Sequence, residues 1–278
     1  MISPRHTRLA IGGLRHLVLA IGAFVVLFPF VWMLSASFKL PNEIYTQEVR
    51  LIPIVWTLEN YIRAFSAQPL GKYLINGVIV TFGIFAFQVL FSLPCAYALA
   101  KLNFRGREVL FGLIMLGLLI PEYVISIPIF FMFFKIGLLN TYWSLIIPFW
   151  ISAFGIFLMR QFFKTIPDEL LDAARLDGCS EIMIVWRIMA PLAVPAVMAF
   201  AIFSVVFHWN DFYWPLIMVN DDSIATPPLG IVLFSNGEAG NAVGPMMAAA
   251  VIITLPLILL FLSMQQRFIE GLTMGNFK

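Results

Sequence analysis

Between Lys72 and Lys101 the chain reads YLINGVIVTFGIFAFQVLFSLPCAYALA, which is 28 residues without a charged side chain. About 20 apolar residues are enough to cross roughly 30 Å of hydrocarbon as an α-helix. Lipid offers no hydrogen-bond partner to backbone N–H and C=O groups, so an open chain crosses a membrane only as a helix. This stretch therefore predicts a transmembrane helix at about residues 73–100.

Five more stretches of similar length lie on either side of this one, each bounded by charged residues. One of them, between Glu108 and Lys135, is interrupted once by Glu122. The first stretch is longer than the apolar region of a signal peptide, which has about 7–15 residues, so we interpret it as a retained helix. We predict an all-α membrane protein, a single domain over residues 1–278, with six transmembrane helices at about 16–38, 73–100, 109–134, 138–159, 188–216 and 245–264.

The composition of the whole chain agrees with this class. Hydrophobic residues make up 61% of the chain and charged residues 12%, whereas soluble domains have about 45–50% and about 25%. The mean hydropathy is +0.94. These values exclude a soluble enzyme, a disordered scaffold and a secreted disulfide framework. The net charge of +2 is too small to indicate nucleic acid as a partner, so membrane lipid is the expected surrounding.

Lysine and arginine are unevenly distributed between the two sides of the predicted helices. These residues are enriched in cytoplasmic loops, and their distribution sets the orientation of a membrane protein. Both termini are therefore predicted to face the cytoplasm, because that orientation places only 5 of the 17 basic residues outside. The 12 on the inside are Arg5, Arg8, Arg15, Lys101, Arg105, Arg107, Arg160, Lys164, Arg175, Arg187, Arg267 and Lys278.

The segment between the fourth and fifth predicted helices, residues 160–187, carries nine charged residues. Residues 167–169 suit the first turn of a helix, and Gly178 suits the stop after its last turn. Ser180 suits the N-cap of a second helix. The pattern predicts a helix, a glycine turn and a second helix on the cytoplasmic side. From the residues alone, this segment is either a solvated linker or a docking element for a partner protein.

Four polar residues within or beside the predicted helices are candidates for the path of a solute. Glu122 lies midway along the third predicted helix, where a carboxylate is costly. It either lines the path or stabilises a broken helix. Asn76 and Asn210 either bond the solute or bond across helices, and bonding across helices is the favoured interpretation. Asp211 lies near the outer end of the fifth helix, where a structural or gating role is favoured over proton transfer.

The segment 160–187 also carries a recognisable motif. The string ELLDAARLDG at 169–178, followed by Ile188, Pro191 and Pro195, resembles the EAA loop of binding-protein-dependent ABC importer permeases. The end of the chain, QQRF at 265–268 and GLT at 271–273, is similar to the smaller permease of the maltose transporter class. The resemblance covers nearly the whole chain in order. Further strings that resemble the carbohydrate branch are PFVWMLSASFK at 29–39, LENY at 58–61, AYALA at 96–100, GLLNT at 137–141 and WNDF at 209–212.

This resemblance implies a transport subunit and not an enzyme. The chain would pair with a second, homologous permease in a bacterial inner membrane. Two ATP-binding-cassette subunits would dock on the cytoplasmic side and bind ATP and Mg²⁺, so the permease would need no cofactor of its own. An extracytoplasmic solute-binding protein would deliver the substrate, a carbohydrate or a related polyol or glycoside.

The resemblance also implies roles for five residues of the segment 160–187 as a coupling helix. Asp172 stands where the motif usually has Glu and would meet a basic residue of the ATPase. Ala173 and Ala174 are small enough for close approach, Gly178 allows the turn between the helices, and Asp177 caps or braces that turn. Because Asp is one methylene shorter than Glu, the docking is implied more firmly than a direct ion pair.

A proton-coupled secondary transporter of a small polar solute, with Glu122 or Asp211 as the proton site, is the alternative from another class. The chain holds no G-x-x-x-x-G-K-[ST] string, so a partner subunit or a gradient must supply the energy. An intramembrane enzyme is disfavoured because the three histidines lack metal-ligand spacing. The resemblance further implies that a loop at about 220–244 contacts the binding protein and that the tail 271–278 reaches towards the ATPases.

Overall fold

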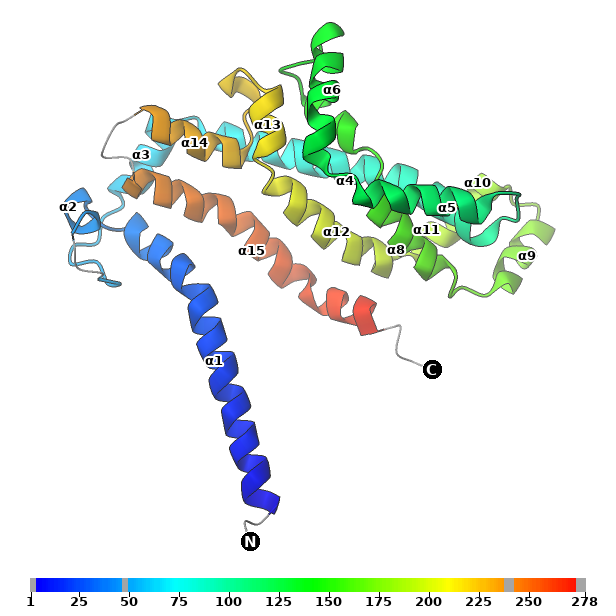
Figure 1. Cartoon of the computed structure of the whole chain (residues 1–278), viewed down its shortest axis with the longest axis horizontal. Helices are drawn as coiled ribbons and strands as arrows, with labels where there is room; N and C mark the ends of the chain where they lie inside the picture. The colour runs from blue at the N-terminus through cyan, green and yellow to red at the C-terminus, as the bar shows by residue number, and fades with distance from the viewer. Residues whose placement is uncertain (1–3, 47–49, 238–242, 274–278) are drawn as a thin grey trace. The chain divides into compact units, whose positions relative to one another are not determined.

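The computed structural model of the chain describes residues 4–46, 50–237 and 243–273 (Figure 1). Regular structure in these ranges is helical, without a strand, which confirms the predicted all-α class. Residues 238–242 of the predicted external loop and 274–278 of the tail lie outside the described residues. The α-helices up to α8 are α1 Pro4–Ser37, α2 Pro41–Ile44, α3 Glu59–Ala67, α4 Leu70–Lys101, α5 Arg107–Leu116, α6 Glu122–Lys135, α7 Tyr142–Ile146 and α8 Ala153–Phe163. The later ones are α9 Asp168–Leu176, α10 Glu181–Ile184, α11 Ala190–Leu192, α12 Val194–Trp209, α13 Tyr213–Met218, α14 Pro227–Gly237 and α15 Val243–Thr273.

Three described helices are long and apolar enough to cross a membrane without a break. The relevant segments are Gly12–Ser37 of α1, Leu70–Lys101 of α4 and Val243–Ser263 of α15. They correspond to the first, second and sixth predicted spans. Between residues 12 and 34 of α1 no residue is buried within the chain, and only the last turn of the helix, residues 35–37, is covered. A helix that is apolar all round and uncovered needs lipid or another subunit around it.

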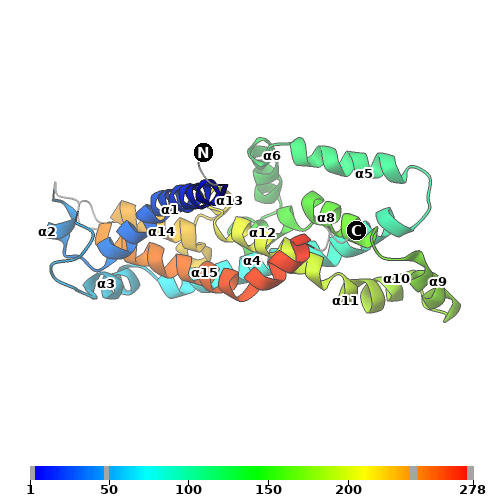
Figure 2. The same cartoon turned by 90° about the horizontal axis from the view of Figure 1, so that it is seen from below.

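The other three predicted spans are bent, and the bend in the third agrees with the broken helix that the sequence left open at Glu122. Residues 107–119 and α6 meet at 93°, residues 142–149 and α8 meet at 45°, and residues 181–192 and α12 meet at 77°. The sharp turn between α5 and α6 is visible in Figures 1 and 2. The described residues therefore offer three membrane-spanning helices, or six if each bent pair forms one span.

Proline explains where the bends occur. Pro121 lies between α5 and α6, and Ile120 before it has an extended backbone with φ −82° and ψ 118°. A residue that precedes proline is pushed out of the helical region by steric clash. Pro195 lies in the first turn of α12, directly after the 77° bend between residues 181–192 and α12. Proline lacks the N–H that would continue the helical hydrogen-bond ladder, so the hydrophobic run continues while the helix stops.

By its internal contacts the chain divides into two compact units. The first is residues 1–70 with 231–254, and the second is residues 71–230 with 255–278. In the first unit, Asn60 of α3 is buried and donates to the carbonyls of Ser37 at 3.1 Å and Lys39 at 2.7 Å. The carboxylate of Glu43 accepts from the N–H groups of Ile54 and Val55. These bonds join α2, α3 and residues 54–55 into a small cap at the end of α1.

The second unit has its main hydrophobic core where α4, α8 and α12 meet the segment 160–187. Leu171 and Ala174 of α9 are buried there. The short helix α9 is thus part of the folded body and not a free linker. The other buried members are Leu93, Ala96, Tyr97, Leu99, Ile156, Met159, Phe163, Ile184, Val185, Met189, Ala193, Ala196 and Phe200.

Candidate functional site

The segment 160–187 contains the predicted helix, glycine turn and second helix. Helix α9 ends in a turn at Gly178, whose φ is +82°. The N–H of Cys179 donates to the carbonyl of Ala174 at 3.0 Å, and the N–H of Gly178 donates to that of Arg175 at 3.0 Å. This pair of bonds is a Schellman motif, which needs a left-handed residue and therefore favours glycine. The hydroxyl of Ser180 then caps α10 by accepting from the N–H of Met183.

Four of the five predicted coupling residues lie on the surface of the chain. Asp172, Ala173, Asp177 and Gly178 are exposed, whereas Ala174 is buried in the core with Leu171. The small size of Ala174 therefore serves packing inside this chain and not approach by another protein. The exposed residues lie at the end of the second unit, on α9 and the turn that follows it (Figure 2).

Apolar side chains accompany these exposed polar residues. Leu176 is 89% exposed and Ile182 is 74% exposed, and Leu170 is also on the surface. These large apolar side chains leave an apolar patch next to the exposed polar residues of a charged segment. The charged residues alone do not reveal this surface.

Arg175 joins α9 to α10. Its guanidinium donates to Asp172 Oδ1 at 2.9 Å and to Glu181 Oε1 at 2.9 Å. The hydroxyl of Tyr97, on α4, donates to the other oxygen of Glu181. One arginine and one tyrosine thus fix both helices of the segment against α4. Because Asp172 already has this partner within the chain, its carboxylate is oriented before any other protein approaches.

Lys101 makes a second connection between α4 and α9. Its ammonium lies 2.6 Å from Asp168 Oδ1 and 2.5 Å from the carbonyl oxygen of Ile166. The Lys101 side chain is only 5% exposed, so it is held in place along its length. Its hydrogen bond and its positive charge hold the pKa of the Asp168 carboxyl below its usual range. The last residue of α4 therefore anchors the first residue of α9.

Arg160 connects three helices close to the same region. Its guanidinium donates to both carboxylate oxygens of Glu108, at 2.7 and 2.8 Å, and to the carbonyl of Leu99 at 3.1 Å. It also lies over the Phe111 ring at 3.8 Å. The residue is buried, so α8 is fixed to α4 and α5 by a charge that has several partners.

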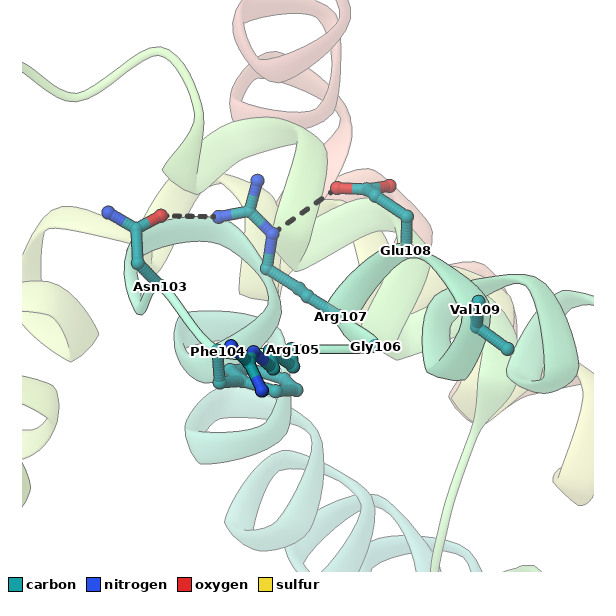
Figure 3. A pocket seen from close by; sticks show the side chains of 7 residues that line it. All are labelled: Asn103, Phe104, Arg105, Gly106, Arg107, Glu108 and Val109. Atoms are coloured by element: carbon teal, nitrogen blue, oxygen red, sulfur yellow. Dashed lines mark hydrogen bonds and ion pairs between the residues drawn. The ribbon is translucent and has the colours of Figure 1, made fainter.

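The turn between α4 and α5 lies at the same end as α9 in both views (Figures 1 and 2). Figure 3 shows the Arg107 side chain between Asn103 and Glu108, with donor distances of 3.4 and 3.3 Å. Gly106, with φ +84°, allows the turn. The residues 103–109 line a cavity of about 520 Å³. This turn adds Arg105 and Arg107 to the same end of the second unit as α9.

Asn76 has all its hydrogen bonds within the chain. Its amide donates to the carbonyls of Ser223 at 3.1 Å and Ala225 at 3.0 Å, and it accepts from the Tyr142 hydroxyl at 2.6 Å. It is buried. Of the two roles that the sequence left open for Asn76, these contacts support bonding between elements. The sequence leaves the same two roles open for Gln88, and its contacts with Ser204 at 2.6 Å and His208 at 3.2 Å likewise support bonding across helices.

Glu122 and Asp211 come close together although 89 residues separate them in the chain. Tyr123 and Tyr213, their neighbours, have ring centroids 4.6 Å apart, and Ser126 Oγ lies 2.8 Å from the Tyr213 hydroxyl. Asp211 accepts from the N–H of Trp214, and none of the ion pairs between described residues includes either carboxylate. A cavity of about 290 Å³ lies beside them, lined by Ser126, Ile127, Phe130, Tyr213 and Ile217.

Asn210 is separate from this group in its contacts. Its side chain is exposed and donates back to the carbonyl of Val206, one turn earlier in α12, at 2.8 Å. The four predicted path residues therefore divide into an acidic pair between α6 and α13, a buried structural amide, and a helix-terminal amide. The sequence could not reveal that Tyr97, Lys101 and Arg160 connect the helices. A charged group or hydroxyl at the end of an apolar run does not indicate which distant residue it will bind.

Comparison with known proteins places the chain in a family. The family model described as the inner membrane component of binding-protein-dependent transport systems matches residues 88–273. The arabinooligosaccharides transport system permease protein AraQ of Halalkalibacterium halodurans is 35% identical over 259 residues, covering 92% of each chain. The diacetylchitobiose uptake system permease protein NgcG of Streptomyces coelicolor is 30% identical, covering 95% of this chain and 88% of its own length.

A solved structure shows the same fold. It is a chain in the crystal structure of a bacterial ABC transporter involved in the import of the acidic polysaccharide alginate. Its TM-score is 0.84 at 24% identity, and the match covers 96% of this chain and 99% of that chain. Together with the family match and the relatives, this likeness confirms the resemblance that the sequence carries. The chain belongs to the binding-protein-dependent transport system inner membrane components, the permeases of ABC importers, which are transport subunits and not enzymes.

Proposed function

We propose that this permease forms, with a second homologous permease, the path through which a carbohydrate enters the cell. A binding protein outside the membrane would deliver the carbohydrate, and two ATP-binding-cassette subunits would bind ATP and Mg²⁺ below. The named substrates of two relatives, arabinooligosaccharides and diacetylchitobiose, support a carbohydrate over other polar solutes. In this proposal the chain is one membrane domain with six spans, three of them bent, and both termini are in the cytoplasm.

The segment 160–187 is the coupling element in this proposal. The observation that carries it is that α9 is held by Lys101, by Tyr97 through Glu181, and by the core, while its outer surface stays exposed. A partner that grips the exposed side of α9 therefore moves the body of the permease and not only a loop. The proposed contact surface on an ATPase subunit includes Asp172, Ala173, Asp177 and Leu176.

ATP then acts through two states of the complex. Closing of the ATPase dimer would displace the two coupling segments, one from each permease, and each segment would carry its helices along. The two states must differ in their contacts with ATP-bound and ATP-free ATPases, because a ligand shifts an equilibrium only by its differential affinity. In this chain the bends at residues 119–122 and 192–194 are the places where helical segments can rotate against each other.

The carbohydrate path would pass the face where α6 meets α13. Glu122 and Asp211 supply oxygen acceptors for sugar hydroxyls, and the Tyr123 and Tyr213 rings supply apolar faces for the C–H groups of a sugar ring. Carboxylates without a cationic partner within the membrane are costly and mark functional positions by default. We assign Asn76 to the internal hydrogen-bond network and Asn210 to the end of α12, and neither to substrate contact.

The decisive experiment measures what drives uptake. The chain would be reconstituted in liposomes alone, and again with its second permease, its ATPases and its binding protein. We expect uptake of the binding protein's sugar only in the complete complex, with ATP on the side of the membrane where the ATPases dock on the segment 160–187. Accumulation by the chain alone on a proton gradient would overturn the proposal in favour of a secondary transporter with Glu122 or Asp211 as the proton site.

The coupling role has its own test in Gly178→Val. A β-branched residue at φ +82° costs roughly 1–2 kcal/mol of backbone strain and removes the Schellman turn. We expect uptake to fall at least tenfold while the complex still hydrolyses ATP. The matched control is Gly137→Val, because Gly137 has a similar φ of +70° and open space around it, but follows α6. Equal uptake by both variants would contradict the coupling role.

A further inference from the structure

Helix α4 has polar or close contacts at three levels along its length. Its 32 residues would extend for about 48 Å, and Asn76 and Tyr97 are about 30 Å apart along its axis, which matches the thickness of the hydrocarbon core. The three levels are the Tyr97 and Lys101 contacts with the segment 160–187, the Gln88 contacts with α12, and the Asn76 contacts with residues 222–225. Few helices of a membrane protein bury polar side chains at both ends and in the middle.

The end at Tyr97 and Lys101 holds the coupling segment. Tyr97 bonds Glu181, which in turn bonds Arg175, and Lys101 bonds Asp168 and the carbonyl of Ile166. These contacts reach the start of α9, its last turn and the start of α10. Displacement of α9 and α10 relative to α4 would therefore break several charge-assisted hydrogen bonds at once.

The end at Asn76 holds the segment that leads into α14. The Asn76 amide bonds the carbonyls of Ser223 and Ala225, as described above. Two glycines leave room for neighbouring rings: a Cβ on Gly77 would lie 2.7 Å from the Pro227 ring, and a Cβ on Gly230 would lie 2.2 Å from the Tyr73 ring. Tyr73 and Ala225 are fully buried. This end is packed so closely that α4 and residues 223–230 must move together.

The middle of α4 is fixed to α12. Gln88 accepts from the Ser204 hydroxyl at 2.6 Å and bonds the His208 ring at 3.2 Å, and all three residues are buried. Buried amide and imidazole groups that pair across helices resist sliding, because separation would leave them without partners. The helix is thus held along its length and not only at its ends.

We infer that α4 is the rigid connection through which movement of the coupling segment reaches residues 219–226 at the opposite end of the second unit. This inference rests on the proposed function, which supplies the movement at α9. The inference goes beyond the proposed function because it assigns the transmission of that movement to α4. The positioning residues are Tyr97, Lys101, Asn76 and Gly77. Residues 219–226 precede α14, on the loop where the sequence expects contact with the binding protein.

The test measures movement at residue 222 when ATP binds. Asp222 is exposed, and Asp222→Cys would carry a nitroxide label in a chain with Cys95→Ala and Cys179→Ala, assembled in nanodiscs with its second permease and ATPases. The probes are ATP with vanadate against no nucleotide. We expect the label's electron paramagnetic resonance spectrum to change with nucleotide, and the change to shrink at least threefold in Lys101→Met and in Asn76→Ala.

Two control variants separate transmission from general damage. Lys101→Arg should restore the spectral change, because a guanidinium can still reach Asp168. Gly77→Ala must displace the Pro227 ring and should weaken the response, whereas Gly71→Ala on the same helix meets no atom within 4 Å and should leave it intact. The Gly77 and Gly71 variants also keep the test valid if Asn76→Ala does not assemble.

Three outcomes would overturn the inference. They are a label that does not respond to nucleotide in the unmodified helix, a full response in both Lys101→Met and Asn76→Ala, and an equal loss in Gly71→Ala and Gly77→Ala. Sugar uptake by the same complexes identifies which idea has failed. If uptake is driven by ATP but the label does not respond, only the role of α4 falls; if ATP drives no uptake, the proposed function falls.

Discussion

The acidic residues of α9 and α10 contrast with those beside α6 and α13. Asp168, Asp172 and Glu181 each have a lysine or arginine partner within the chain. Glu122 and Asp211 take part in none of the ion pairs between described residues. The paired acids are solvent-exposed residues that fix the geometry of a short helix. The two others lie in predicted membrane spans, where a carboxylate is costly, so their oxygens are available to a solute. The same side-chain type therefore serves structure at one site and contact at the other.

The largest expected effect comes from breaking the paired group. Glu181→Gln removes the charge that holds Arg175 and weakens the bond from Tyr97. We expect sugar uptake by the complete complex to fall at least tenfold, with the ATPase rate changed less than twofold. Glu169→Gln is the matched control, because Glu169 is an exposed acid of the neighbouring helix α9 outside the ion pairs described above. A similar loss in both variants would show that the negative charge of the segment 160–187 matters and the pairing with Arg175 does not.

A smaller effect is expected from neutralising the unpaired group. Ile127 lines the cavity beside Tyr213 and is exposed. The native cysteines of the complex are replaced and Ile127→Cys is introduced as the single reactive thiol. A cationic methanethiosulfonate reagent should modify this thiol faster than an anionic reagent of equal size, because two carboxylates attract cations. Glu122→Gln with Asp211→Asn should lower this rate ratio three- to tenfold.

The same measurement has two reference positions. Ile52→Cys, 73% exposed beyond the end of α1, gives the intrinsic rate ratio of the two reagents, and Phe24→Cys, exposed on the apolar surface of α1, should react with neither. If Ile127→Cys is as unreactive as Phe24→Cys, lipid or the second permease covers this face and the path lies elsewhere.

The smallest effect concerns the single pair of Lys101 and Asp168. Because the pKa of Asp168 is lowered in the folded chain, its contribution to stability is present above the unfolded pKa of about 4 and is lost as pH falls through the folded value. An ion pair with one exposed partner contributes at most about 1 kcal/mol. Asp168→Asn should therefore lower the melting temperature of the solubilised complex slightly at pH 7, and by less as the pH is lowered below about 4. A difference that grows on acidification would contradict the assignment.

The sequence predicted the helical class, the unbroken second span and the helix–turn–helix at 168–184, because apolar run length, Gly178 and Ser180 act locally. It placed all six apolar runs and left a broken helix open at Glu122, but it did not predict the bends in the fourth and fifth spans. Whether Pro121 bends a helix or breaks it depends on what the following segment packs against, which is a long-range property. For the same reason the sequence could not tell that Asn76 binds residues 223–225, or that Glu122 meets Asp211.

The break at Ile120–Pro121 also bears on the life of the chain before assembly. The last carbonyls of a helix have no partner within it, and hydrocarbon supplies no donors. A break in mid-membrane is therefore stable only where protein or water covers it. A newly made copy without its companion permease would present this break, and the bare apolar surface of α1, to lipid alone. Supply of the companion subunit would then set how long each copy survives the membrane proteases, and so how many transporters a cell can hold.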